Sequence, residues 1–161
     1  MGKTTEELLV EAEELLKPWT VAAARPEADR LDVSLAVSDL LAATEAILAG
    51  SENGYLTAIT GVDYPAAEDG AESQIEVLYT FCNGPALLNL RVRVPYSNPR
   101  LPTVCNLIPS ATLYEREMIE MFGVTIDGTP NTDRLLLPDD WPDGVYPLRK
   151  SFTGLNDLTT A

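Results

Sequence analysis

The sequence predicts an α+β fold in which a mixed or antiparallel sheet of about four strands has helices packed on it, followed by an extended C-terminal segment. Two runs near the N-terminus, and one that begins after residue 110, repeat apolar residues at helical spacing. Three other runs are rich in β-branched and aromatic residues and are joined in sequence, which favours an antiparallel or mixed sheet. We therefore expect an α/β domain over residues 1–123 and an extended segment over residues 124–161, named the strap below.

The first helix is predicted to begin after Thr4, because Thr4 and Glu7 have the spacing of a capping box. Leucines then recur at helical spacing, with glutamates on the opposite face, until Pro18 ends the helix. In Arg30–Val37 apolar and polar residues alternate, which is typical of a half-buried strand.

The second helix can be capped by Ser38 or Asp39 and ends at Gly50. Three further strands are predicted at Tyr55–Asp63, Ile75–Cys82 and Leu87–Val94. The polar stretch Tyr64–Ser73 is expected to be a loop, and Asn83–Pro85 is short enough for a hairpin turn.

The third helix is predicted over Ala111–Phe122, with Ser110 as its N-cap and Gly123 as its left-handed C-terminal residue. Arg116 and Glu120 lie four residues apart on one face, so they are expected to form an ion pair.

The charge of the chain indicates the kind of partner to expect. The net charge of −14 argues against nucleic-acid binding, because that affinity comes mainly from basic side chains that neutralise phosphates. Residues 1–90 carry four basic and sixteen acidic side chains, whereas residues 91–161 carry seven and nine. The first part is therefore expected to be a solvated outer face and the second part to be closer to a protein-docking surface.

Several kinds of chemistry are excluded or disfavoured by residue types. The chain has no histidine, so Ser-His-Asp triads, Cys-His pairs and histidine metal sites are excluded. Cys82 and Cys105 lie far apart without C-x-x-C spacing, so we expect two buried, reduced thiols and no cluster or zinc site held by this chain alone. No apolar run approaches the roughly 18 residues of a membrane span, and the acidic N-terminus lacks a secretory signal pattern.

Glu115 and Glu117 invite an acid–base interpretation, together with Asp139 or Asp140. Two residues on a helix that are two positions apart point about 200° away from one another, so these two glutamates are not expected to act on one bond. We expect instead that one of them faces the sheet and binds backbone or arginine groups, while another faces a partner or holds the strap. A small acid–base enzyme using Glu115 or Glu117 remains the distant alternative.

The strap combines charge, proline and one tryptophan, Trp141. Proline reduces the entropy lost when an extended segment is immobilised, and tryptophan and arginine are frequent at interface hot spots. Two interpretations stay open and are compatible with one another: a strap that packs on its own domain and a strap that lies on a partner.

Three motifs resemble the signature of the 30-kDa subunit family of respiratory complex I, a family found in NADH–quinone oxidoreductases that includes relatives in energy-converting [NiFe] hydrogenases. The motifs are YEREMIEMFGV at 114–124, LLPDDW at 136–141 and PLRK at 147–150. The resemblance is dense from about Ser110 to Phe152. The chain departs from the family pattern at Glu120, within Gly128–Arg134, where a histidine and an arginine are usual, and at Ser151.

The resemblance implies a subunit with no cofactor and no chemistry of its own. Such a subunit belongs to the hydrophilic arm on the cytoplasmic side of the cell membrane and touches the membrane only through other subunits. Its partners are the large catalytic (49-kDa or hydrogenase-large-like) subunit and the small iron–sulfur subunit. Iron–sulfur clusters, and in the hydrogenase alternative a NiFe centre, belong to those partners. The implied interface and motif residues are Glu115, Arg116, Glu117, Phe122, Gly123, Arg134, Asp140, Trp141, Leu148, Arg149 and Lys150.

Overall fold

The computed structural model describes residues 2–50, 54–66 and 70–154 and has the predicted α+β class. Its elements are, in order, α1 (Thr5–Leu16), β1 (Ala22–Glu27), β2 (Arg30–Ser34), α2 (Leu40–Gly50), β3 (Tyr55–Tyr64), β4 (Gln74–Asn83), β5 (Ala86–Pro95), β6 (Arg100–Pro102), α3 (Thr112–Phe122) and β7 (Thr125–Asp127). Short 3₁₀ turns lie at Lys17–Trp19, Val37–Asp39 and Pro109–Ala111. The predicted loop Tyr64–Ser73 and the end of the strap lie partly outside the described residues.

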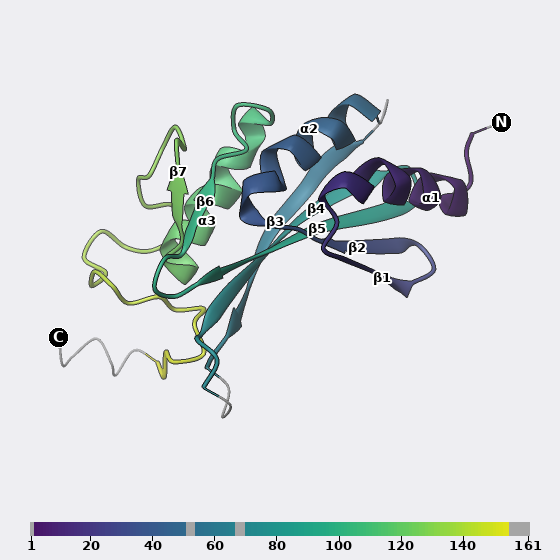
Figure 1. Cartoon of the computed structure of the whole chain (residues 1–161). Coiled ribbons are helices and arrows are strands. Elements are labelled where there is room, and N and C mark those ends of the chain that lie inside the picture. The colour runs from purple at the N-terminus through teal and green to yellow at the C-terminus, as the bar shows by residue number, and fades with distance from the viewer. Residues whose placement is uncertain (1, 51–53, 67–69, 155–161) are drawn as a thin grey trace.

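Five strands form a mixed sheet in the order β1-β2-β5-β4-β3 (Figure 1). β2 and β5 are parallel, and the other neighbours are antiparallel. The hairpin between β4 and β5 turns at Gly84, whose φ is +58°. Beside this sheet, β6 and β7 pair in parallel, so the strap begins as a short strand.

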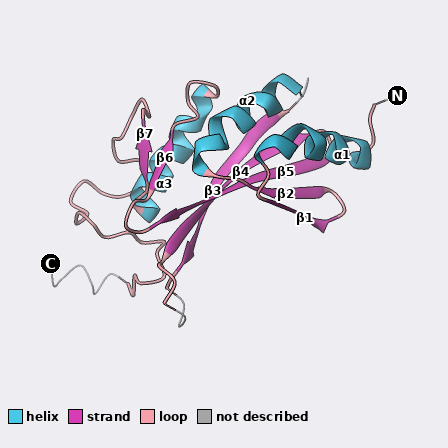
Figure 2. Ribbon diagram, viewed as in Figure 1, coloured by secondary structure: helices cyan, strands magenta, loops and turns pink. Residues whose placement is uncertain are grey.

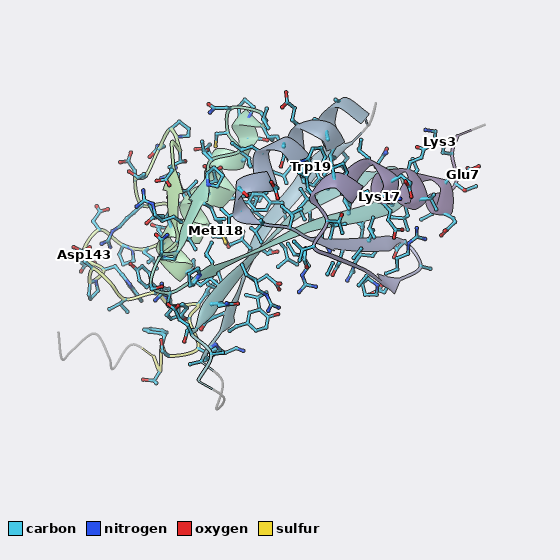
Figure 3. The ribbon with its side chains drawn as sticks, viewed as in Figure 1. Lys3, Glu7, Lys17, Trp19, Met118 and Asp143 are labelled. Carbon is cyan, nitrogen blue, oxygen red and sulfur yellow. The ribbon has the colours of Figure 1, made fainter. Side chains whose placement is uncertain are left out.

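The helices lie on one face of the five-stranded sheet, as Figure 2 shows. On that face, alternate residues of β4 and β5 are buried, among them Val77, Tyr79, Phe81, Leu90 and Val92. Met118 of α3, labelled in Figure 3, belongs to the same core at 1% exposure. The period of two in the strands and of 3.6 in the helices thus brings the apolar residues into one core.

The opposite face of the sheet carries a hydrogen-bonded network of charged side chains. Arg91 reaches Asp32 on β2 at 2.8 Å and Glu76 on β4 at 2.5 Å. Arg93 binds the other oxygen of Glu76 at 2.9 Å. Asn89 donates to Asp32 at 2.7 Å. These bonds join three adjacent strands.

The sheet has one more strand than the sequence predicts. β1 is exposed along its whole length and has no apolar alternation, so nothing in its pattern distinguishes it from a loop. It forms by antiparallel pairing with β2, and Arg25 ties it to Glu6 and Glu13 of α1.

The helix starts agree only partly with the predictions. The capping box of α1 is confirmed, with the Thr4 amide 2.8 Å from Glu7 Oε2. The predicted Ser110 cap of α3 is wrong: Ala111 occupies the N-cap position and no side chain caps the helix. A 3₁₀ turn that starts at Pro109 leads into α3 instead. The predicted strand Arg30–Val37 ends at Ser34, and Ser38 and Asp39 lie in a 3₁₀ turn.

Candidate functional site

The candidate site is built around α3, whose C-terminus depends on two glycines. Gly123 has φ +69° and donates its amide to Ile119 at 3.1 Å, the left-handed ending that the sequence predicts. A Cβ at Gly123 would lie 2.3 Å from the Tyr146 ring, so the aromatic ring of the strap fills the space next to this residue. A Cβ at Gly61 on β3 would similarly lie 2.6 Å from the Phe122 ring. The observed positions of the Tyr146 and Phe122 rings therefore require glycine at 123 and 61.

Arg116 and Glu120 do not pair with each other, so the predicted ion pair is wrong. Arg116 donates to the carbonyls of Asp133 and Arg134 at 2.8 and 2.6 Å. Glu120 accepts the amides of Leu135 and Leu136 at 2.6 and 2.9 Å. The strap brings two carbonyls and two amides to this face of α3. Leaving these backbone groups without partners costs more free energy than losing an ion pair between the two side chains. A glutamate of this helix therefore holds the strap together with Arg116, but it is Glu120 and neither Glu115 nor Glu117.

The middle of the strap is closed by its own side chains. Arg134 donates to the carbonyls of Pro138 and Trp141, both at 2.7 Å, and pairs with Asp143 at 3.2 Å. The Trp141 indole N–H donates to the Val145 carbonyl at 2.9 Å. Figure 3 labels Asp143 at the outer margin of the molecule. A segment with no regular element thus keeps its polar backbone groups satisfied.

The Pro147–Lys150 motif binds the C-terminus of α3. The Leu148 amide donates to the Met121 carbonyl at 3.2 Å, and Arg149 Nε donates to the Phe122 carbonyl at 2.7 Å. The Arg149 guanidinium lies 4.2 Å from the Tyr96 ring centroid and 4.4 Å from that of Tyr146. A cation at the carbonyl end of a helix is favoured by the helix dipole, and the two rings add cation–π attraction.

Asp63 on β3 anchors the end of this motif. It accepts the Lys150 amide at 2.7 Å and also the Tyr96 hydroxyl. Burial, together with the hydrogen bond to Asp63, raises the pKa of Tyr96 to about 12. The strap is thereby joined to β3, an edge strand of the sheet.

Glu115 points away from the strap into the core. It is fully buried, and its carboxylate accepts hydrogen bonds from the Thr103 hydroxyl at 2.8 Å and the Val104 amide at 2.8 Å. The Cys105 thiol lies 3.2 Å from the same carboxylate, and burial raises the pKa of that thiol. Glu115 therefore fixes the irregular segment that follows β6. Cys105 is buried as predicted, whereas Cys82 is half-buried, and both are free thiols.

The predicted site residues thus form two clusters, and Glu115 and three other residues lie outside them. Arg116, Arg134 and Trp141 meet at the middle of the strap, and Phe122, Gly123, Leu148 and Arg149 meet at the end of α3. Glu115 stands apart in the core. Among the described residues, the side chains of Glu117 and Asp140 make no hydrogen bond or ion pair, and the Lys150 ammonium lies 6.0 Å from the Tyr64 ring centroid. Their assignment to a partner interface stays a prediction.

Sequence reasoning missed several partners of these groups. Tyr146 directly precedes the last motif, and the glycine expected at the end of the third helix was a signal that something packs there. Asp63, Tyr96 and Thr103 gave no signal, because only the folded chain brings them to α3 and the strap.

A hollow of about 280 Å³ lies between α3 and the strap, walled by Ile119, Leu137, Trp141, Val145 and Tyr146 among others. Within the described ranges there is no group of three or more acidic or cysteine side chains arranged to hold a metal ion. In the same ranges, no helix has the length and apolar character needed to cross a bilayer.

Comparison with known proteins gives a consistent set of relatives. Residues 33–157 match the family model of the 30-kDa subunit of respiratory-chain NADH dehydrogenase. The chain is 37% identical over 97 residues to an NADH-quinone oxidoreductase subunit of Acidothermus cellulolyticus, covering 60% of this chain and 49% of that protein. It is 40% identical over 88 residues to the membrane-bound hydrogenase subunit beta of Pyrococcus furiosus, covering 55% of this chain and 50% of that protein. The chain thus spans about half the length of the curated relatives it matches.

A solved structure extends the similarity to the whole fold. The structure of the membrane-bound sulfane sulfur reductase, an archaeal respiratory membrane complex, contains a chain that matches with a TM-score of 0.78 and 25% identity. The match covers 97% of this chain and 90% of that chain.

Proposed function

Because the chain belongs to the 30-kDa subunit family of respiratory-chain NADH dehydrogenase, we propose that it is a non-catalytic structural subunit of a membrane-associated, complex-I-like oxidoreductase. In this proposal it lies in the hydrophilic arm, on the cytoplasmic side, and contacts the membrane only through other subunits. It holds the large catalytic subunit and the small iron–sulfur subunit in fixed positions. The redox centres belong to those partners.

The proposal rests on the hydrogen-bond partners of the charged side chains in and near the family motifs. Arg116, Glu120, Arg134 and Arg149 direct their hydrogen bonds mainly to backbone groups of the strap and of the end of α3. Side chains engaged in this way order a segment and are not free to transfer protons or bind a substrate. The motifs therefore build a preformed strap, and preorganisation lowers the entropy lost when a partner binds.

A preformed strap suits a subunit whose task is positioning. Electron transfer between centres depends steeply on their separation, so a subunit that fixes the geometry of its neighbours contributes to the reaction without a redox centre. Trp141, half-buried on the wall of the hollow, is the residue type most often found at the centre of protein interfaces.

The acid–base alternative receives no support from the geometry. Glu115 has 0% exposure and its oxygens are held by Thr103 and Val104, so substrate cannot reach it. Glu117 is half-buried on a different side of the helix, and Asp139 and Asp140 are exposed on the strap. These carboxylates do not converge on one reacting bond.

A second candidate within the same class is the equivalent subunit of an energy-converting [NiFe] hydrogenase. It is favoured by the 40% identity to the membrane-bound hydrogenase subunit beta, which is similar to the identity with the quinone-linked relative. The neighbouring reading frames discriminate the two. A large subunit with paired C-x-x-C motifs near both ends identifies a hydrogenase, and their absence identifies a quinone or another acceptor.

Replacing Trp141 with alanine tests the proposed function. Trp141→Ala should leave the thermal unfolding of the isolated chain nearly unchanged while lowering the amount of large subunit that copurifies, by roughly tenfold or more for a hot-spot tryptophan. The purified wild-type chain should be colourless, free of metal and without turnover. Robust activity of the chain alone, or collapse of the isolated Trp141→Ala fold, contradicts the proposal.

A further inference from the structure

One carboxylate of α3 is left without a partner. Glu115, Arg116 and Glu120 each bind groups within the chain. The side chain of Glu117, which lies between them in the sequence and is half-buried, forms no hydrogen bond or ion pair within the part of the chain that the structure describes. Partial burial of a carboxylate without a counter-charge raises the free energy of the folded chain.

Two exposed leucines flank this carboxylate. Leu113 precedes Glu117 by one helical turn and is 53% exposed. Leu136 of the strap is 60% exposed. Its amide is bound by Glu120, which follows Glu117 by three residues on the helix. Leu113, Glu117 and Leu136 together are named the Glu117 surface. Exposed apolar patches that are bordered by polar residues are typical of interaction sites.

The surroundings of the Glu117 surface are acidic. Asp133, Asp139 and Asp140 are exposed on the strap. The cation of α3 and that of the adjoining strap are already engaged, because Arg116 binds two backbone carbonyls and Arg134 binds two more as well as Asp143. No positive group of the neighbouring strap segment is therefore left for Glu117.

A partner that covers the Glu117 surface must supply a cation. Covering the leucines is favourable, at about 25 cal/mol for each Å² of apolar area removed from water. Covering an unpaired carboxylate is strongly unfavourable unless an opposite charge comes with the partner. A second copy of this chain, with a net charge of −14, would bring the same acidic surface and is disfavoured by repulsion.

We propose that the Glu117 surface binds a segment of a partner subunit that carries an arginine or lysine between apolar side chains. The inference rests on the proposed function and deepens it by specifying the chemistry of the partner. Arginine suits the position best, because its guanidinium is weakly hydrated and pairs with a carboxylate through two hydrogen bonds.

The test uses the assembly isolated from the native host through an affinity tag on this chain, with the large subunit quantified per copy of the chain. Glu117→Lys should lower that ratio by about tenfold or more, since it places two cations face to face, and Glu117→Gln should have a smaller effect. Glu45→Lys, an exposed glutamate on α2 with no partner among the described residues, is the matched control and should retain the wild-type ratio.

A crosslink identifies the contacting segment. A thiol-directed photocrosslinker on Leu136→Cys should capture a partner peptide with a basic residue among apolar ones, and replacing that base with glutamate should restore the assembly of Glu117→Lys. If Glu117→Lys lowers the melting temperature of the purified chain, Leu136→Asp takes its place in the ratio measurement, because that side chain is largely exposed.

The outcomes separate this inference from the proposed function. A wild-type ratio in Glu117→Lys together with a loss in Trp141→Ala overturns the inference alone, as does a crosslink to a second copy or to a peptide without a base. Absence of the large subunit from the wild-type preparation overturns the inference and the proposed function together.

Discussion

The body formed by the five-stranded sheet with its helices and the strap that follows it differ in what holds them in place. In the body, many buried apolar side chains from α1, α2, α3 and the sheet share one core. In the strap beyond β7, the described residues are held mainly by a few charged side chains that bind backbone groups, chiefly those of Arg116, Glu120 and Arg149. Apolar packing is spread over many contacts, whereas the position of the strap depends on single residues.

This difference implies two levels of stability within one chain. A segment with few buried apolar contacts opens locally at lower free energy than a packed core. The chain has two tryptophans, Trp19 packed against the core and Trp141 in the strap. Single-tryptophan variants therefore report the two regions separately, and the predictions below use them from the largest expected effect to the smallest.

Phe81→Ala should have the largest effect, because Phe81 is 2% exposed in the core and its removal leaves a cavity. We expect a loss of about 4 kcal/mol in the free energy of unfolding, seen equally by both tryptophans in urea titrations. A strap signal that survives the loss of the body signal contradicts the idea that the strap depends on the body.

Gly123→Ala should come next, at about 3 kcal/mol, because it adds backbone strain at φ +69° and displaces the Tyr146 ring. Gly144→Ala is the matched control: its φ is +79° but a Cβ there meets no atom within 4 Å, so only the strain remains. Equal losses of stability in the two variants would mean that the Tyr146 ring can move away from residue 123 with little loss of free energy.

Glu120→Ala should release the strap while leaving the body folded. The Leu135 and Leu136 amides lose their acceptors, and we expect a cost of about 2 kcal/mol that appears in the Trp141 signal and in faster hydrogen exchange of these two amides. Glu117→Ala, on the same helix but without a partner among the described residues, is the control. Unchanged protection of both amides in Glu120→Ala would show that another contact holds the strap.

The smallest effect is expected from the protonation of Glu76 in the wild-type chain, which occurs only in acid. Burial opposes its ionisation, but the hydrogen bonds and charges of Arg91 and Arg93 outweigh burial and lower the pKa of the carboxyl below its ordinary value of 4.5. Glu76 therefore stabilises the fold above pH 4.5, and this contribution is lost as the pH falls through the lowered pKa.

The measurement is the urea midpoint of the Trp19 signal between pH 6 and pH 3. Glu76→Gln should be less stable than wild type at pH 6 and should show a shallower decline toward pH 3, whereas Glu45→Gln should follow the wild-type curve. A Glu76→Gln midpoint that falls as steeply as that of wild type rules out this source of acid sensitivity.

The predictions from sequence are accurate where interactions within one element determine the structure, and they fail where contacts between distant segments determine it. α1, β4 and β5 were predicted to within one or two residues at each boundary, because their patterns repeat along the element itself. β1 was missed, since it owes its form to pairing with β2. The ion pair of Arg116 with Glu120 was wrong for a similar reason, because helix spacing makes a pair possible but the strap offers both residues better partners.

The sequence by itself determined the α+β class, the positions of the main elements, the glycine ending of α3 and the family motifs. These depend on local periodicity, on backbone preferences and on residue types. Only the tertiary structure decided which motif charges are used within the chain and which remain free. That outcome depends on backbone groups of the strap, on Asp63 and on Tyr146, which come within hydrogen-bonding distance or contact of α3 only when distant parts of the chain meet.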